Sequence, residues 1–182
     1  MTATPGTRHG FVRRMLGAAL LDSHVYEEVE ADHSANGQAA WVVVLSAVAA
    51  GIGSIANQGW GGVLWYTVAA LVGWYLWAAI AFAIGTRLLP GPYTRADLGE
   101  LLRTIGFSSA PGVLRILAIF PPIAGLVFLI STLWMLVAMV VAVRQALDYC
   151  TTRRAIAVCA IGFPFYAVTL ALSLILLGPW LI

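Results

Sequence analysis

Long apolar runs separated by short polar segments organise this chain. Four such runs are visible directly, over residues 39–57, 63–88, 122–143 and 155–177. A helix needs about 20 apolar residues to cross a bilayer core about 30 Å thick, and each run is near that length. Strict alternation of apolar and polar residues does not occur in them. Their backbone groups are therefore expected to be satisfied within helices, and the fold class is predicted to be all-α.

The distribution of arginine predicts a fifth crossing. Arg and Lys collect in cytoplasmic loops, yet four crossings would put the loop containing Arg87 and the turn containing Arg144 on opposite faces. A short, broken third span over residues 106–120 would put both loops on the same face. Pro121–Pro122 cannot continue a helix interior, so they form a natural outer turn after this span. Each outer segment then lacks arginine. We expect a bundle of five transmembrane helices with a cytoplasmic N-terminus and a C-terminus on the far side.

The first 38 residues are expected to form a cytoplasmic amphipathic segment ahead of a membrane domain over 39–182. Apolar residues recur at helical spacing in this segment, beside the charged Arg13 and Arg14. Such a pattern is typical of a helix that lies in the membrane interface.

A second amphipathic helix is expected on the cytoplasmic face between the second and third spans. Thr94 and Asp97 form a capping pattern, and an apolar stripe follows over residues 98–105. Gly106 and the serines after it are expected to hinge this helix into the short third span.

Composition agrees with a membrane protein and narrows the activity classes. Hydrophobic residues make up 61% of the chain and charged residues 10%, and the mean hydropathy is +0.91, which a water-soluble domain does not show. All 10 basic residues are arginine, and with abundant Ala and Gly this predicts a bacterial gene. Basic residues spread along a membrane face argue against nucleic-acid binding. The motifs of phosphate loops, zinc proteases, nucleophile elbows and redox dithiols do not occur, so neither an enzyme nor a cofactor is expected.

A polar network on the cytoplasmic side is the candidate functional site. Arg103 and Arg115 lie close to or within bilayer depth, where a charge without compensation costs about 2.5 to 3.5 kcal/mol. Arg144 and Asp148 are spaced i to i+4 and are expected to pair. The network is predicted to fix the packing of the bundle, to bind a lipid headgroup or protein partner, or to line a solute path. Its members are Glu27, Glu28, Glu30, Asp97, Glu100, Arg103, Arg115, Arg144, Asp148 and Arg154.

A metal site is the weaker hypothesis for the acidic stretch near the N-terminus. His24 and Glu28 are four residues apart, and Glu30 with His33 forms one Glu-x-x-His pair on a helix face, an arrangement found in metal-binding bundles. A di-metal site needs a second such pair, which the sequence lacks. A solvated, capped helix is the favoured interpretation, and no metal is expected.

Three segments together with Trp134 carry a family pattern. The segments are LLRTIGFSSAPG at 101–112, VAVRQALD at 141–148 and Arg154–Ala155, and a less specific match runs from Tyr26 to Asp32 and on to Gln38–Ala39. The chain resembles the bacterial branch of the Yip-one domain family, the Ypt/Rab-interacting integral membrane proteins. The resemblance implies five spans with the two termini on opposite sides. Eukaryotic members are implicated in membrane traffic through contacts with prenylated Rab-type GTPases and with each other, and the resemblance does not extend to their long cytoplasmic N-terminal domain.

We expect a non-enzymatic scaffold or adaptor in the bacterial inner membrane. Its expected partners are membrane lipids and either a second copy, through small-residue helix faces, or another membrane protein. A small transporter or channel is one alternative, favoured by the Pro-interrupted third span beside buried arginines. An accessory subunit of a larger membrane complex is another.

Overall fold

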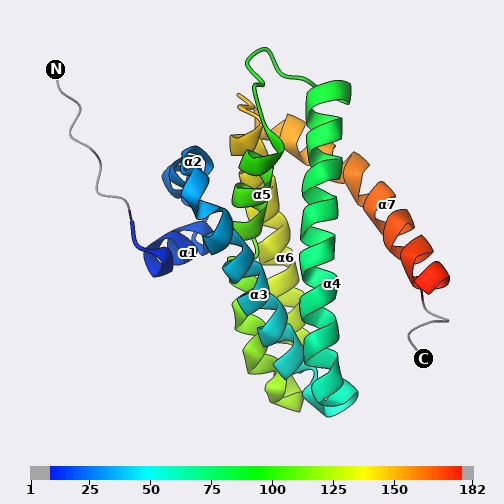
Figure 1. Ribbon diagram of the computed structural model, residues 1–182. Helices are drawn as coiled ribbons and strands as arrows, with labels where there is room; N and C mark the ends of the chain where they lie inside the picture. The colour runs from blue at the N-terminus through cyan, green and yellow to red at the C-terminus, as the bar shows by residue number, and fades with distance from the viewer. Residues whose placement is uncertain (1–8, 178–182) are drawn as a thin grey trace.

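A computed structural model describes residues 9–177, and the side chains of residues 56–59, 61–62, 65–66 and 169–177 lie outside that description. Every regular element within the described residues is helical, which confirms the predicted all-α class. Figure 1 shows α3, α4, α5 and α6 side by side in an elongated bundle, with α1 and α2 on one flank and α7 slanting away on the other.

Four helical stretches among the described residues are long and apolar enough to cross a membrane. They are His33–Gly53, Thr67–Leu88, Leu98–Ile119 and Pro121–Ala146. Their length and composition bear out the multi-pass membrane class. The predicted last span, 155–177, falls within α7 (Thr152–Leu177). Because the side chains at the end of α7 lie outside the described residues, as does the predicted far-side C-terminus at 178–182, a fifth crossing stays a prediction.

The turn between α3 (Asn36–Gly53) and α4 (Ile55–Ala83) is tighter than the outer loop predicted at 57–62. The Ser54 hydroxyl donates to the Ala50 carbonyl oxygen at 2.8 Å and closes the last turn of α3. A Cβ on Gly51 would lie 2.7 Å from the Cα of Val63. Glycine therefore lets the two helices approach closely at the turn.

The third traverse joins α5 (Leu98–Phe107) to a 3-10 helix, η3 (Ala110–Ile119), through Ser108 and Ser109. The predicted hinge is present. The structure differs from the prediction that residues 98–105 form a separate helix on the cytoplasmic face, outside the third span. Leu101 and Ile105 are buried in one core cluster while Phe107 is buried in another. Since opposite sides of α5 are covered by protein, this helix belongs to the bundle.

A capping box begins α5. The Glu100 N–H donates to Asp97 Oδ1 and the Asp97 N–H donates to Glu100 Oε2, both at 2.8 Å. The predicted pairing of Thr94 with Asp97 is wrong, because Thr94 Oγ1 donates instead to the Leu147 carbonyl oxygen at 2.8 Å. That bond attaches the loop before α5 to the end of α6.

A π-helical turn, η2 (Ile84–Leu88), ends the second traverse. The Tyr149 hydroxyl lies 2.6 Å from the Leu89 carbonyl oxygen and 3.2 Å from that of Gly85, so it satisfies carbonyls that the wider turn exposes. Gly85 allows close packing here, because a Cβ would overlap the side chain of Leu147 and force it to move. The loop after η2 and the turn between α6 (Pro121–Ala146) and α7 therefore meet at one end of the bundle (Figure 1).

The N-terminal helices α1 (Phe11–Ala19) and α2 (Ser23–Ala31) are part of the core rather than an appendage. A short 3-10 turn, η1 (His33–Ala35), joins them to α3. Tyr26 and Val29 of α2 are fully buried in a cluster with Phe107 of α5 and Ala142 of α6. A separate cluster, around Leu101 and Leu147, lies among α4, α5, α6 and α7.

Candidate functional site

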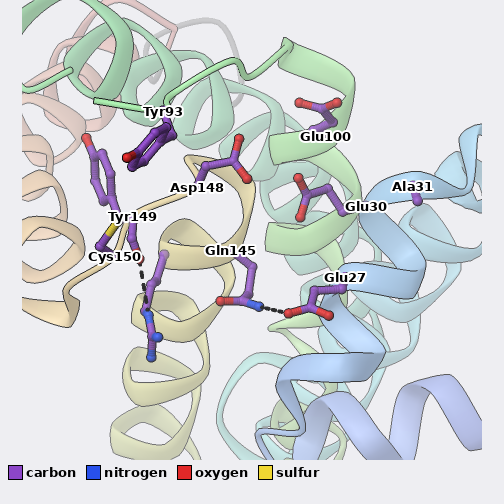
Figure 2. A pocket seen from close by; sticks show the side chains of 10 residues that line it. Glu27, Glu30, Ala31, Tyr93, Glu100, Gln145, Asp148, Tyr149 and Cys150 are labelled. Atoms are coloured by element: carbon purple, nitrogen blue, oxygen red, sulfur yellow. Dashed lines mark hydrogen bonds between the residues drawn. The ribbon is translucent and has the colours of Figure 1, made fainter. Parts of the chain in front are cut away.

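A polar cavity of about 620 Å³ opens where α2, the loop before α5, α5 and the α6–α7 turn meet (Figure 2). Its wall contains four carboxylates and one guanidinium, and we name this cavity the acidic recess. Its lining residues are Glu27, Glu30, Ala31, Tyr93, Glu100, Arg144, Gln145, Asp148, Tyr149 and Cys150.

The α6–α7 turn positions one side of the recess. Asp148 has φ of 51°, a left-handed conformation that Asp tolerates better than most residues. Its N–H donates to the Gln145 carbonyl at 2.9 Å, and the Tyr149 N–H donates to the Arg144 carbonyl at 3.0 Å. Arg144 Nε donates back to the Tyr149 carbonyl at 3.4 Å. Among the residues that the structure describes, no ion pair joins Arg144 to Asp148, so that predicted pairing is not formed.

Negative charge is crowded around Glu30. Burial raises the pKa of the Glu30 carboxyl to about 7, and repulsion from Asp148, Glu100 and Glu27 adds to the effect, while Arg103 opposes it. A positive charge that entered the recess would favour the ionised form of Glu30 by offsetting this repulsion.

Two polar contacts hold α2 against the bundle. Arg103, which is 1% exposed, donates from Nη2 and Nε to the Glu30 carbonyl oxygen at 2.6 and 3.1 Å. Its Nη1 lies 3.4 Å from Asn36 Oδ1. On the other side of the recess, Gln145 Nε2 donates to Glu27 Oε1 at 2.9 Å, as the dashed line in Figure 2 marks. Helix α2 is therefore held through its main chain by α5 and through the Glu27 carboxylate by α6.

A second polar cluster lies between α1, α2 and the start of α3. Arg14, 2% exposed, donates from Nη2 to Glu28 Oε1 at 2.8 Å and to Asp32 Oδ2 at 2.9 Å. Its Nη1 donates to Gln38 Oε1 at 3.2 Å. His9 adds its backbone N–H and its ring, whose Nδ1 lies 2.6 Å from Glu28 Oε2. We name these five residues the Arg14 cluster.

Both carboxylates of the Arg14 cluster are stabilised in the charged form. Burial opposes ionisation of Glu28, but hydrogen bonds from Arg14 and His9 outweigh it and lower the pKa of Glu28. The Ser34 hydroxyl hydrogen-bonds to Asp32, burial acts against ionisation, and Arg14 adds a further bond, so the pKa of Asp32 falls to about 2. The cluster therefore holds α1 against α2 through ion pairs.

Sequence reasoning missed Arg14, His9 and Gln38 as site residues. A signal for Arg14 was present in the helical spacing of α1, because position 14 shares a face with Ala18, and that face is buried. His9 and Gln38 gave no signal of their own, since their roles depend on how α1 folds back over α2.

The comparison with protein families decides the classification. The model that describes the Yip1 domain matches residues 18–175, most of the chain. The chain belongs to the Yip1 domain family. This confirms the resemblance at the level of the family. No curated protein and no solved structure matches the chain.

The matched Yip1 domain contains the whole acidic recess and every residue of the predicted network. Five predicted residues line the recess, and they are Glu27, Glu30, Glu100, Arg144 and Asp148. Arg103 binds the main chain behind them. Glu28 belongs instead to the Arg14 cluster, and Asp97 caps α5. Arg154 donates to the Pro90 carbonyl oxygen at 2.8 Å.

Arg115 is not brought to the recess of the Yip1 domain. It lies on η3, where Nε donates to Ser131 Oγ at 3.1 Å and Nη2 to Thr132 Oγ1 at 2.9 Å. Its guanidinium carbon also sits 5.6 Å from the ring centroid of Phe128. These hydroxyls and this ring belong to the apolar length of α6, so Arg115 is compensated within the bundle.

The four metal candidates of the Yip1 domain do not converge. Glu28 binds Arg14, and His24 Nδ1 lies 3.6 Å from Glu27 Oε2. Glu30 faces the acidic recess and His33 is exposed. Over the described part of the chain, no group of three or more His, Cys, Asp or Glu side chains is placed to hold a metal ion.

Proposed function

We propose that this Yip1 domain protein is a non-enzymatic adaptor of the bacterial inner membrane, and that its acidic recess binds a basic segment of a membrane partner. The observation that carries the proposal is the recess itself, whose wall holds four carboxylates and a single arginine at one end of the bundle. The partner is either a second copy of the chain or another membrane protein.

A guanidinium suits the recess better than other groups. Arginine binds carboxylates through two parallel hydrogen bonds, and it stacks on aromatic rings. Tyr93, 70% exposed, supplies such a ring at the edge of the cavity. A cavity of about 620 Å³ has room for one or two basic side chains.

The distribution of arginine supports a cytoplasmic position for the recess. Arg144, Arg153 and Arg154 flank the α6–α7 turn, and Arg87 and Arg95 flank the loop that meets it. Positive residues near the ends of spans favour the cytoplasmic side. Arginine in place of lysine throughout the chain supports a bacterial origin.

Photo-cross-linking in native membranes tests the adaptor proposal. A benzophenone amino acid in place of Tyr93 is expected to capture a partner, and Glu27→Gln with Asp148→Asn is expected to reduce the adduct. Gln preserves a polar contact to Gln145, and Asn tolerates the left-handed turn at 148. Asp22→Asn is the matched control, because it removes one charge outside the recess and keeps a side chain that caps α2.

Two results would contradict the adaptor proposal: no adduct at position 93, or an adduct that the two recess substitutions leave unchanged. The mass of the adduct identifies the kind of partner. Twice the chain mass indicates self-association. A different mass at constant stoichiometry indicates an adaptor or accessory subunit bound to a foreign protein.

Transport is the second candidate function, and one observation favours it. A cavity of about 650 Å³ lies within the bundle among α3, α4, α6 and α7, with Arg115, Ser46 and Ser109 as polar members of its wall. Interrupted helices beside polar groups at membrane depth are typical of solute sites. Purified protein in sealed liposomes that moved ions or small solutes, and lost this flux on Arg115→Met, would support transport over the adaptor role.

A further inference from the structure

Helix α1 presents an apolar ridge outward and buries one of its two arginines, Arg14, on the opposite side. Val12, Leu16 and Leu20 are 60%, 55% and 74% exposed. They lie four residues apart, and Leu20 is the residue that caps the end of α1, so they form one line along one side of the helix. Arg14 and Ala18, on the opposite side, are 2% and 0% exposed. A helix lying in water would show the reverse pattern.

The orientation of α1 is held by specific bonds. The indole Nε1 of Trp134 donates to the Ala19 carbonyl at 2.7 Å, and the Tyr26 hydroxyl donates to the Ala18 carbonyl at 3.1 Å. These bonds satisfy two carbonyls in the last turn of α1, while Arg14 attaches the first half of the helix to α2. These bonds fix the orientation of α1, so the outward position of the ridge is part of the fold.

The position of Trp134 along α6 gives the depth of α1, because this residue bonds to the last turn of α1. Large exposed apolar residues on α6 run from Ile123 to Val137, which marks its lipid-facing length. Counting about 20 residues from Phe120, for a core of about 30 Å, places the inner boundary of the hydrocarbon near Val140. Trp134 lies six residues short of that position, which is about 9 Å inside the boundary.

Contacts on the other side of α1 give a consistent depth. Its inward residues Phe11, Met15 and Ala18 pack in a cluster with Phe107 and Ala110, at the junction of α5 and η3. In Figure 1, α1 lies against the flank of the bundle, well away from the end where the loops meet. The junction lies nine residues beyond the start of α5, about 14 Å along the helix axis.

We propose that α1 is an in-plane helix inserted into one leaflet, and that Val12, Leu16 and Leu20 contact lipid acyl chains. Trp134 bonds the end of α1 to α6, whose large apolar residues are exposed along the same length. Arg13, exposed beside the ridge, has a stem long enough to carry its charge toward the headgroups. Helices inserted in this way respond to the packing and composition of the leaflet they enter. The family match begins at residue 18, so most of the ridge lies outside it.

Spin-label accessibility in liposomes tests the occupant of the ridge. The full chain with Cys150→Ser and Cys159→Ser receives a nitroxide at Leu16→Cys, and at Leu20→Cys in a second variant. We expect both labels to collide more often with oxygen than with a water-soluble nickel chelate, as a label at the lipid-facing Leu133 does. Thr151→Cys, in the exposed α6–α7 turn, is the aqueous reference and is expected to show the reverse ratio.

Two results would overturn the insertion of α1. Accessibility to the nickel chelate equal to that at Thr151 would place the ridge in water. Suppressed collisions with both reagents would place it against protein, as in a contact with a second copy. The unfolding temperature of each labelled variant, compared with the cysteine-free chain, shows whether the label disturbs the fold, and agreement between positions 16 and 20 excludes a local artefact.

Discussion

Arg103 on α5 donates through two nitrogens to the main-chain carbonyl oxygen of Glu30 on α2, which lies 73 positions earlier in the sequence. The shorter bond is 2.6 Å, and the guanidinium is 1% exposed. This contact fixes the last turn of α2 over the bundle and leaves the Glu30 carboxylate at the acidic recess. Much of the candidate site therefore depends on one buried cation.

Replacement of Arg103 by methionine is expected to destabilise the chain by about 2 to 3 kcal/mol. The substitution removes two charge-assisted hydrogen bonds and leaves a carbonyl without its donor. Unfolding in mild detergent, followed by circular dichroism, measures the change. Arg95→Met, at an exposed loop position, is the control and is expected to stay within about 0.5 kcal/mol of the parent. Equal effects of the two substitutions would mean that the Arg103 contact is not a main support of α2.

The Arg14 cluster is expected to behave as a coupled unit. Arg14→Met alone should cost about 3 kcal/mol, because it removes the guanidinium from a partly buried Glu28. Combining it with Glu28→Gln should cost less than the sum of the two single changes, by about 0.5 to 3 kcal/mol. A double-mutant cycle on unfolding free energies gives this number, with the exposed Arg13→Met as control. Strict additivity would contradict the ion pair.

Glu30 is expected to make stability fall as the pH rises from about 4.5 to about 7. The ordinary pKa of 4.5 applies to the unfolded chain, and the folded pKa is about 7. Between these values the folded state binds more protons than the unfolded state, so each rise in pH favours unfolding. Glu30→Gln should flatten that part of the profile of unfolding temperature against pH, whereas Asp22→Asn should leave it unchanged. A slope that survives Glu30→Gln would assign the effect to another group.

Removing the Tyr149 hydroxyl is expected to cost about 1 kcal/mol. The hydroxyl serves the carbonyls of Leu89 and Gly85 around the π-helical turn. Tyr149→Phe keeps the ring that packs there and removes only the contacts of the hydroxyl with these two carbonyls. Tyr93→Phe, on an exposed tyrosine of the same recess, is the matched control. A stability loss from Tyr93→Phe as large as that from Tyr149→Phe would show that the π turn does not depend on the bond.

The sequence predicted the helical class and the approximate positions of the four apolar stretches that are long enough to cross a membrane, because runs of apolar residues at bilayer length have few other structural solutions. It missed details set by tertiary contact. The turn at Ser54 depends on glycines that allow close helix approach, and α5 joins the bundle because neighbouring helices cover its charged side as well as its apolar stripe.

The candidate site was predictable in part. Glu30, Glu100 and Asp148 were assigned to one face because the arginine pattern places their segments at one end, and the structure brings them to one cavity. Arg14 was not predicted, since an arginine near the N-terminus is usually solvated and its burial requires α2 to fold over α1. Arg115 was assigned to the same network, but it finds hydroxyl partners farther along α6.

Labelling of the native Cys150 tests the sidedness on which the adaptor role depends. Cys150 is exposed and lines the acidic recess, and Cys159→Ser removes the other thiol. A membrane-impermeant maleimide is expected to label Cys150 in inside-out vesicles and not in intact spheroplasts, whereas Phe120→Cys, at the opposite end of the bundle, reports the reverse. Labelling of Cys150 in intact spheroplasts, to the extent seen after detergent lysis, would contradict a cytoplasmic recess.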